Sequence, residues 1–387
     1  MTLKNANVSN KALLEIDENI DSLVRQIELL SYVNPVNIEE AKSRFFRSKY
    51  LTDPEFEYPE IDFDRFKLHR ELFIQPLEEI EDLEIRQFYE DIIYTYSGLI
   101  QCIETIGSGK KFYYNCLHCF GTPTEKDVEN AKFILHFDDG DMDDERFVPK
   151  YSSRQTEPFF QAYSKQYKFD YNFEHSSKIS ASAMVRNNTK TLVLNDNYLF
   201  SEHELNVLNN HEIGVHMVTT MNGREHRLKI FSHGLPNYEE TQEGLAVFAE
   251  YMSNNLTVKR LKELAYRVIA VDSLAKGYSF STTFRLLHNQ FDLDRETAFY
   301  ISLRVHRGGG FTKDYLYLTG LKKIYDLYTK GKDLSPLLIG KVSLEYYDVI
   351  ESLIKKGYAK TPLYLTSAYT ENNNSDDRIN FILNNLK

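Results

Sequence analysis

The 387-residue sequence contains no tryptophan, only three cysteines and no run of 18 or more apolar residues. A helix needs about 20 mostly apolar residues to cross a bilayer, so the missing run predicts no transmembrane helix and no membrane partner. The N-terminal segment MTLKNANVSNKALLEID lacks the apolar core and small-residue cleavage site of a secretory signal. A secreted fold of this size would more often carry an even set of cysteines for disulfides. These absences predict a cytoplasmic protein.

Basic residues are also in short supply. The chain has 46 Lys and Arg against 57 Asp and Glu, which gives a formal net charge of -11. A general nucleic-acid binder would usually carry a basic surface, so we expect no nucleic-acid partner. Hydrophobic residues make up 42% of the chain, with 27 Tyr and 25 Phe, which is enough for a sizeable core. The length fits two or three domains, or one large catalytic unit with a helical extension.

Apolar residues at helical spacing dominate the chain. They predict helices over residues 11–32, 38–50, 76–106, 125–137, 238–255, 258–276, 295–306, 313–331 and 343–356. Two strands are predicted at Lys178–Val185 and Thr191–Leu194, joined by a hairpin or tight turn at Asn187-Asn188. We therefore expect an α+β fold that is dominated by helices, with a small sheet directly before the helix described next.

The most clearly marked helix begins at Ser201-Glu202-His203-Glu204, which fits a capping box, and is predicted to run to about Met221. It carries the segment His211-Glu212-Ile213-Gly214-Val215-His216, an HExxxH motif. In the better-known HExxH motif, two histidines about 40° apart on a helix bind one zinc. With one more residue between them, they lie about 140° apart on a regular α-helix. A π-type turn would bring them back to one side, and Gly214 would ease that distortion.

A metal site at this motif needs a third ligand. Glu243 is the candidate, on a helix that opens after Pro236, and Gly244 would let this helix approach the motif helix closely. His226 and His233, in the loop between the two helices, are rival ligands. Two histidines and one carboxylate leave a fourth zinc position open for water, as catalytic sites require. Manganese or iron stays open, because ligand type alone does not decide the metal.

The two segments NNHEIGVHMVTTMNG and IFSHGLPNYEETQEGLAVFAEY together resemble the bacterial flavohaemoglobin expression-modulating QEGLA-motif family, with QEGLA at Gln242–Ala246. That family is similar to the microtubule-associated tyrosine carboxypeptidases. The segments VNPVNIEEAKSRFF, CFGTPTEKDVENA and RVHRGGGFTKDYLYLTG also look like landmarks of the family, so the resemblance covers most of the chain.

This resemblance implies a zincin-like metallopeptidase fold and hydrolase activity. We expect a helical region over residues 1–110 and a catalytic domain over 111–387. The resemblance also implies Zn²⁺ as cofactor, bound by His211, His216 and Glu243, with Glu212 as the catalytic base. The substrate it implies is the C-terminal tail of a peptide or protein. A carboxypeptidase must also bind a free carboxylate, which arginine does through two hydrogen bonds, and Arg307 is our candidate for that role.

Two other interpretations stay open. A regulatory protein could keep the metal and the peptidase shape without turnover, although a binding module has no need of Glu212 as a base beside the metal. An interaction scaffold without metal is the third alternative. The lone pair Cys116 and Cys119 has no second CxxC to complete a zinc ribbon, so we interpret these residues as core or loop thiols.

Overall fold

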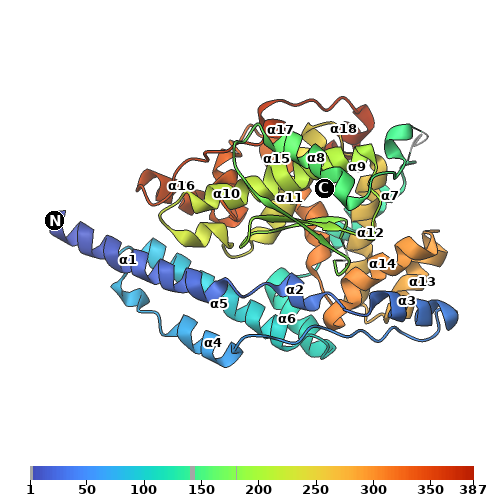
Figure 1. The fold of residues 1–387 in the computed structure, drawn as a ribbon, viewed down its shortest axis with the longest axis horizontal. Helices are drawn as coiled ribbons and strands as arrows, with labels where there is room; N and C mark the ends of the chain where they lie inside the picture. The colour runs from blue at the N-terminus through green and yellow to red at the C-terminus, as the bar shows by residue number, and fades with distance from the viewer. Residues whose placement is uncertain (1–2, 140–143, 180) are drawn as a thin grey trace.

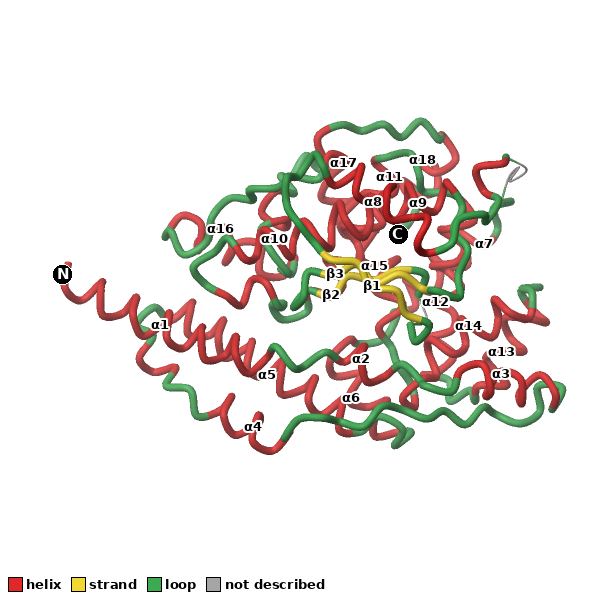
Figure 2. Tube along the Cα trace, viewed as in Figure 1, coloured by secondary structure: helices red, strands yellow, loops and turns green. Residues whose placement is uncertain are grey.

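The computed structural model describes residues 3–139, 144–179 and 181–387. Helices dominate it, and one three-stranded sheet completes an α+β fold, as the sequence pattern predicts (Figures 1 and 2). In both figures the first six helices lie below the sheet, and most of the later helices lie above it. These six are α1 (Leu3–Val24), α2 (Leu29–Val33), α3 (Ile38–Arg47), α4 (Arg65–Phe73), α5 (Leu83–Glu104) and α6 (Lys110–Phe120).

The remaining helices form the body around the sheet. They are α7 (Glu125–Leu135), α8 (Ser153–Ser164), α9 (Glu202–Leu208), α10 (Val218–Arg224), α11 (Tyr238–Met252), α12 (Val258–Ala275), α13 (Phe280–Arg285), α14 (Arg295–His306), α15 (Leu316–Thr329), α16 (Tyr347–Lys355), α17 (Ser367–Thr370) and α18 (Asp377–Asn384). One hydrophobic cluster contains buried residues of the lower helices, from Leu13 in α1 onward, and of the body, as far as Leu386. The layer below the sheet therefore shares its core with the body above it. The proposed division at residue 110 stays a prediction.

The sheet has the strand order β1-β3-β2, formed by β1 (Asn172–Ser176), β2 (Ala183–Arg186) and β3 (Thr191–Asn195). The predicted hairpin is confirmed, because β2 pairs with β3 in antiparallel fashion. Parallel β1 was not predicted from the sequence. The central strand β3 is buried from Thr191 to Leu194, and a second hydrophobic cluster packs it against α9.

The first predicted strand is shorter than expected. Lys178 and Ile179 precede β2 outside any strand, and Ser180 lies outside the described residues. The side-chain amide of Asn195 donates to the backbone carbonyls of Ile179 and Ala181, at 3.0 and 3.1 Å. These carbonyls therefore bind a side chain rather than a neighbouring strand, and strand pairing starts only at Ala183.

The helix predicted over residues 11–32 is broken in the structure, where α1 ends at Val24 and α2 begins at Leu29. Val24, Ile27, Leu29 and Val33 are all buried in the core. On one continuous helix, at about 100° per residue, Leu29 and Val33 would face away from Val24. The break turns both pairs toward the core, where α2 packs against α5.

Candidate metal centre

The HExxxH segment forms a π-helix, η3 (Asn209–Met217), between α9 and α10. The predicted capping box at Ser201 is confirmed, because its hydroxyl accepts from the Glu204 amide and the Glu204 carboxylate accepts from the Ser201 amide. The wider turn of the π-helix brings the rings of His211 and His216 to one side, with their centroids 5.0 Å apart. The π-type turn expected from the i+5 spacing is therefore present, and it brings the two rings together.

Carbonyls along the π-helix accept hydrogen bonds from side chains elsewhere in the fold. The hydroxyl of Thr366 donates to the Gly214 carbonyl, and Lys341 Nζ donates to the His216 carbonyl at 2.9 Å. Gly214 has a packing role here, because a Cβ atom would lie 3.0 Å from the Tyr163 hydroxyl oxygen and 3.3 Å from Thr366 Cγ2. The small residue lets Thr366 reach the helix backbone.

Helix α11 places the Glu243 carboxylate near the rings of both His211 and His216. Glu243 Oε2 lies 3.8 Å from His211 Nε2 and 3.6 Å from His216 Nε2. One ligand atom from each of these three residues falls within 4.8 Å of the others. Both distances are longer than an ordinary hydrogen bond. Glu243 Oε2 is buried and has no hydrogen-bond partner among the described residues.

The second oxygen of Glu243 is held from the opposite direction. Lys313, in the 3-10 turn η7 (Lys313–Tyr315), donates to Glu243 Oε1 at 2.5 Å. The expected role of Gly244 is wrong in one respect, because it approaches α15 rather than the motif helix. A Cβ atom on Gly244 would lie 2.3 Å from the backbone carbon of Gly320. Helices α11 and α15 therefore cross closely at the residue that follows Glu243.

The outer nitrogen of His211 has a carboxylate partner. His211 Nδ1 lies 2.8 Å from Glu250 Oε1, and Glu250 is fully buried two helical turns after Glu243. Arg260 of α12 donates to both oxygens of Glu250, at 3.3 and 3.5 Å. A carboxylate on Nδ1 places the proton there and leaves Nε2 as a lone-pair donor toward Glu243. The sequence alone assigned no role to Glu250.

Glu212 is buried beside these ligands, with 7% of its surface exposed. The backbone amide of Val185 in β2 hydrogen-bonds to its carboxylate. Its Oε2 has no partner within the described part of the chain. Burial raises the pKa of Glu212 to about 7, and the nearby Glu243 carboxylate adds to this effect. Burial also lowers the pKa of His216 to about 4, which favours the neutral ring that binds a metal.

The two rival histidines have other partners. His226 Nε2 lies 2.7 Å from the Ile339 carbonyl, and His226 Nδ1 accepts from the Lys360 amide at 3.0 Å. His233 Nε2 lies 2.6 Å from Asp21 Oδ1 on α1. The structure thus brings His211, His216 and Glu243 together and holds both rivals in structural hydrogen bonds.

A cavity of about 1900 Å³ opens from this centre, and His211 and Glu212 form part of its wall. Its other walls come from residues 30–40 below, from the sheet and α9, and from α12 and α14. Figure 1 shows where these elements lie: α2 and α3 are below the sheet, and α12 and α14 are to its right. An extended peptide fits a cavity of this size, since small-molecule pockets are typically about 300–1,000 Å³.

The structure does not bring Arg307 into the wall of this cavity. Arg307 is buried, its guanidinium donates to the side-chain oxygen of Asn34, and it lies 4.8 Å from the centroid of the Phe311 ring. Asn34, in contrast, does line the cavity. The arginines in the wall are Arg186, Arg260, Arg267 and Arg304.

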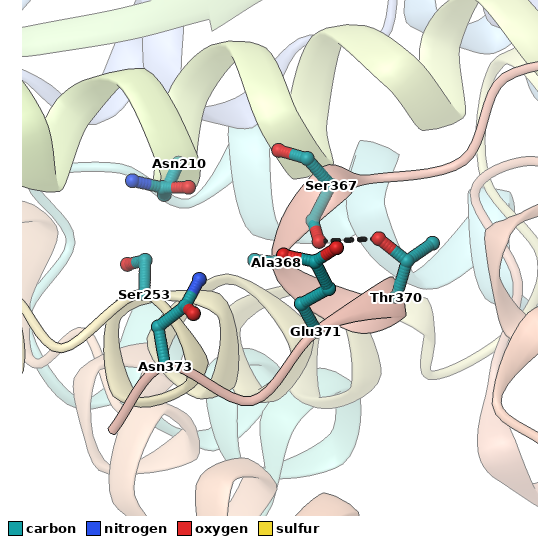
Figure 3. Close-up of a pocket in the computed structure, with 7 residues that line it drawn as sticks. All are labelled: Asn210, Ser253, Ser367, Ala368, Thr370, Glu371 and Asn373. Carbon is teal, nitrogen blue, oxygen red and sulfur yellow. Dashed lines mark hydrogen bonds between the residues drawn. The ribbon is translucent and has the colours of Figure 1, made fainter. Parts of the chain in front are cut away.

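A smaller hollow of about 290 Å³ lies where η3, α11 and α17 meet (Figure 3). Its wall includes Asn210, Ser253, Ser367 and Asn373, and Glu371 is its one titratable group. A single carboxylate among amides and hydroxyls offers no acid–base pair. We therefore place the chemistry in the large cavity.

The chain has a helix-dominated α+β fold in which two histidines of a π-helix and a glutamate of α11 lie close enough together that they could hold one metal ion. Residues 43–387 match the family model of the microtubule-associated tyrosine carboxypeptidases, and the chain belongs to this family. A curated mouse (Mus musculus) relative, named "Putative tyrosine carboxypeptidase MATCAP2", is 23% identical over 360 residues. That match covers 88% of this chain and 59% of the mouse protein. Every helix within the described residues is too short or too polar to cross a membrane.

Proposed function

We propose that the protein is a zinc-dependent carboxypeptidase with a zincin-like site, which removes the C-terminal residue from a peptide or protein tail. The convergence of His211, His216 and Glu243 beside Glu212, whose buried Oε2 has no hydrogen-bond partner among the described residues, carries this proposal. Tyrosine is the first residue to test, because the names of the family and of the mouse relative both specify a tyrosine carboxypeptidase.

The three residues fit zinc in chemistry and in spacing. Zinc bonds to histidine nitrogen and carboxylate oxygen are about 2.0–2.2 Å, so tetrahedral ligand atoms lie roughly 3.3–3.5 Å apart. The observed separations from Glu243 Oε2, 3.6 and 3.8 Å, are close to this value. The buried Oε2 has no other partner in the described residues, and a cation between it and the two rings would satisfy it.

Zinc held there would polarise a substrate carbonyl and lower the pKa of a bound water toward about 7. Glu212 accepts a proton from the attacking water as the new carbon–oxygen bond forms. It then gives that proton to the amine nitrogen as the carbon–nitrogen bond breaks. Glu250 holds the His211 ring in one orientation, and Lys313 holds Glu243 by its second oxygen.

An extended substrate would lie along β2. This strand is an edge of the sheet and contacts the π-helix, and its Val185 amide reaches Glu212. Addition of a peptide strand at such an edge is a common recognition mode. Of the two strands considered from the sequence, Thr191–Leu194 lies in central β3 and has no free edge, so the edge strand is the one that begins at Ala183.

The direct test compares peptides that have a free C-terminal tyrosine with the same peptides amidated. Zinc-loaded protein should release tyrosine from the free acids, as read by mass spectrometry, and metal analysis should show about one zinc per chain. Internal cleavage of both peptide sets at equal rates would overturn the carboxypeptidase half of the proposal and leave the zinc half standing.

The Glu212→Gln variant separates an enzyme from a regulatory protein that keeps the site without turnover. We expect it to bind zinc as the wild type does and to lose about 10²- to 10⁴-fold in kcat, the usual contribution of a general base. Wild-type protein that binds one zinc and cleaves no peptide from a C-terminal library would instead support the regulatory alternative.

A further inference from the structure

Five charged residues of α12 line the large cavity, and three of them share one helix face. Arg260, Glu263 and Arg267 are separated by three and four residues, so their side chains lie one above another. Arg260 Nη1 donates to Glu263 at 2.9 Å, and Arg267 donates to the same carboxylate. Since Arg260 also bonds to Glu250, a chain of ion pairs runs from the metal centre along the cavity wall to Arg267.

A second route leads back from Arg267 to the metal centre. The guanidinium of Arg267 lies 5.1 Å from the ring centroid of Tyr317 in α15, and Lys313 Nζ lies 5.2 Å from the same centroid. Lys313 in turn holds Glu243. Arg267 is therefore fixed relative to the metal ligands from two sides, through Glu263 and through Tyr317.

Arg267 differs from the other arginines of the cavity wall in its hydrogen bonds. Arg186 pairs with Glu174, and Arg304 donates twice to Asp314. Arg260 is shared between two carboxylates. Arg267 is 93% buried and shares the Glu263 carboxylate with Arg260. Its Nε–H has no acceptor among the residues described. A buried donor without an acceptor costs about 1–3 kcal/mol and calls for a functional reason.

We propose that Arg267 binds the terminal carboxylate of the substrate, with Tyr317 as the platform beneath its guanidinium. This inference rests on the proposed carboxypeptidase function and assigns the residue that recognises the chain end. The free Nε–H gives the carboxylate a charge-assisted hydrogen bond. The terminal residue then lies between Arg267 and the metal centre, with its peptide carbonyl toward Glu212.

The test uses binding, so that it does not depend on turnover. The probes are the peptide acetyl-Ala-Ala-Tyr and its C-terminal amide, titrated by calorimetry into zinc-loaded Glu212→Gln protein. We expect the free acid to bind at least about tenfold more tightly than the amide. Adding Arg267→Gln should weaken binding of the acid by roughly 10- to 100-fold, to the level of the amide. The amide itself should bind both proteins equally.

Lys262→Gln provides the matched control, because Lys262 is a cation of the same helix, lines the same cavity and pairs with Asp139 at 2.6 Å. It should leave the preference for the acid intact. Arg267→Lys keeps the charge and loses the planar fork, so it should retain part of the preference. Zinc content and thermal unfolding confirm that each variant is folded. Should Arg267→Gln fail to fold, Arg267→Lys decides by the same comparison.

The inference is overturned if acid and amide bind the parent protein equally, if neither binds, or if folded Arg267→Gln keeps the preference. Failure of the proposed function looks different: the preference for the acid would depend on Arg267, yet wild-type protein would release no C-terminal residue.

Discussion

Two buried clusters of this protein combine histidine with carboxylates, and they differ in how their oxygen atoms are used. In the cluster below the sheet, Asp17 accepts from the Tyr89 hydroxyl and from two backbone amides of η4 (Lys229–Ser232). Its neighbour Asp21 accepts from His233 and Arg25. All four carboxylate oxygens of this cluster have protein donors, so the cluster ties α1 to the body and needs nothing further.

The candidate metal centre also combines histidine with carboxylates, but two of its carboxylate oxygens have no donor among the described residues. Glu243 Oε2 and Glu212 Oε2 are buried with no hydrogen-bond partner in the described chain. Each such oxygen costs about 1–3 kcal/mol, and a bound cation would offset that cost. Burial of a histidine beside a carboxylate is therefore not what distinguishes a site in this protein. The unsatisfied carboxylate oxygens of Glu212 and Glu243 set the candidate metal centre apart from the cluster below the sheet.

The largest expected effect tests this comparison directly. His211→Ala or His216→Ala should reduce zinc from about one per chain to nearly none and abolish activity, because two ligands rarely hold catalytic zinc. His233→Ala should keep full zinc and lose about 1–3 kcal/mol of unfolding free energy, since Asp21 loses one donor and keeps Arg25. Metal analysis and denaturant unfolding measure both. Zinc loss in His233→Ala with full zinc in His211→Ala would reverse the assignment.

A smaller effect is expected one contact further from the metal. Glu250→Ala removes the carboxylate on His211 Nδ1 and should weaken zinc binding about 10- to 100-fold, measured by competition with a chelator of known affinity. Glu250→Gln keeps an acceptor for the proton on His211 Nδ1 and should therefore lose less zinc affinity than Glu250→Ala. Asp21→Asn, which changes a carboxylate bonded to the other histidine, should leave zinc affinity unchanged. Equal zinc affinity in Glu250→Ala and wild type would remove Glu250 from the site.

Much of the site was predictable because its information is local. The i+5 spacing of His211 and His216 predicts the π-helix, since no regular helix lets them share a metal. Glu243 lies thirty-two residues after His211, on the next helix that the sequence pattern predicts. The tyrosine carboxypeptidase resemblance, read from the same two segments, is confirmed over most of the chain.

The rest depends on contacts between distant residues. Lys313 reaches Glu243 across 70 positions, and Asn34 meets Arg307 across 273. No local pattern tells that Arg307 lies outside the wall of the cavity while Arg267 is part of it. Strand β1 was missed because it is a short, polar segment that gains its register only from pairing with β3.

The smallest expected effect concerns Asp17, in the cluster below the sheet whose carboxylate oxygens all have donors. Burial raises the pKa of Asp17 from 3.8 to about 6, while its hydrogen bonds with Tyr89 and two amides pull it down and the neighbouring Asp21 charge pushes it up. An acid whose pKa is higher in the folded state stabilises the fold below its unfolded pKa, and this contribution is lost as pH rises through about 6. Between pH 5 and 7 the loss amounts to about 1 kcal/mol.

We therefore expect unfolding free energy to fall by about that amount from pH 5 to pH 7 in protein stripped of metal by a chelator, which removes the pH dependence of zinc binding. Asp17→Asn cannot titrate, so its slope over this range should be flatter than that of wild type by about 1 kcal/mol, even though the variant is less stable at both values. Denaturant unfolding at the two pH values measures the difference. Parallel slopes would mean that Asp17 stays charged from pH 5 to pH 7. Its hydrogen-bond donors would then lower its pKa more than burial raises it.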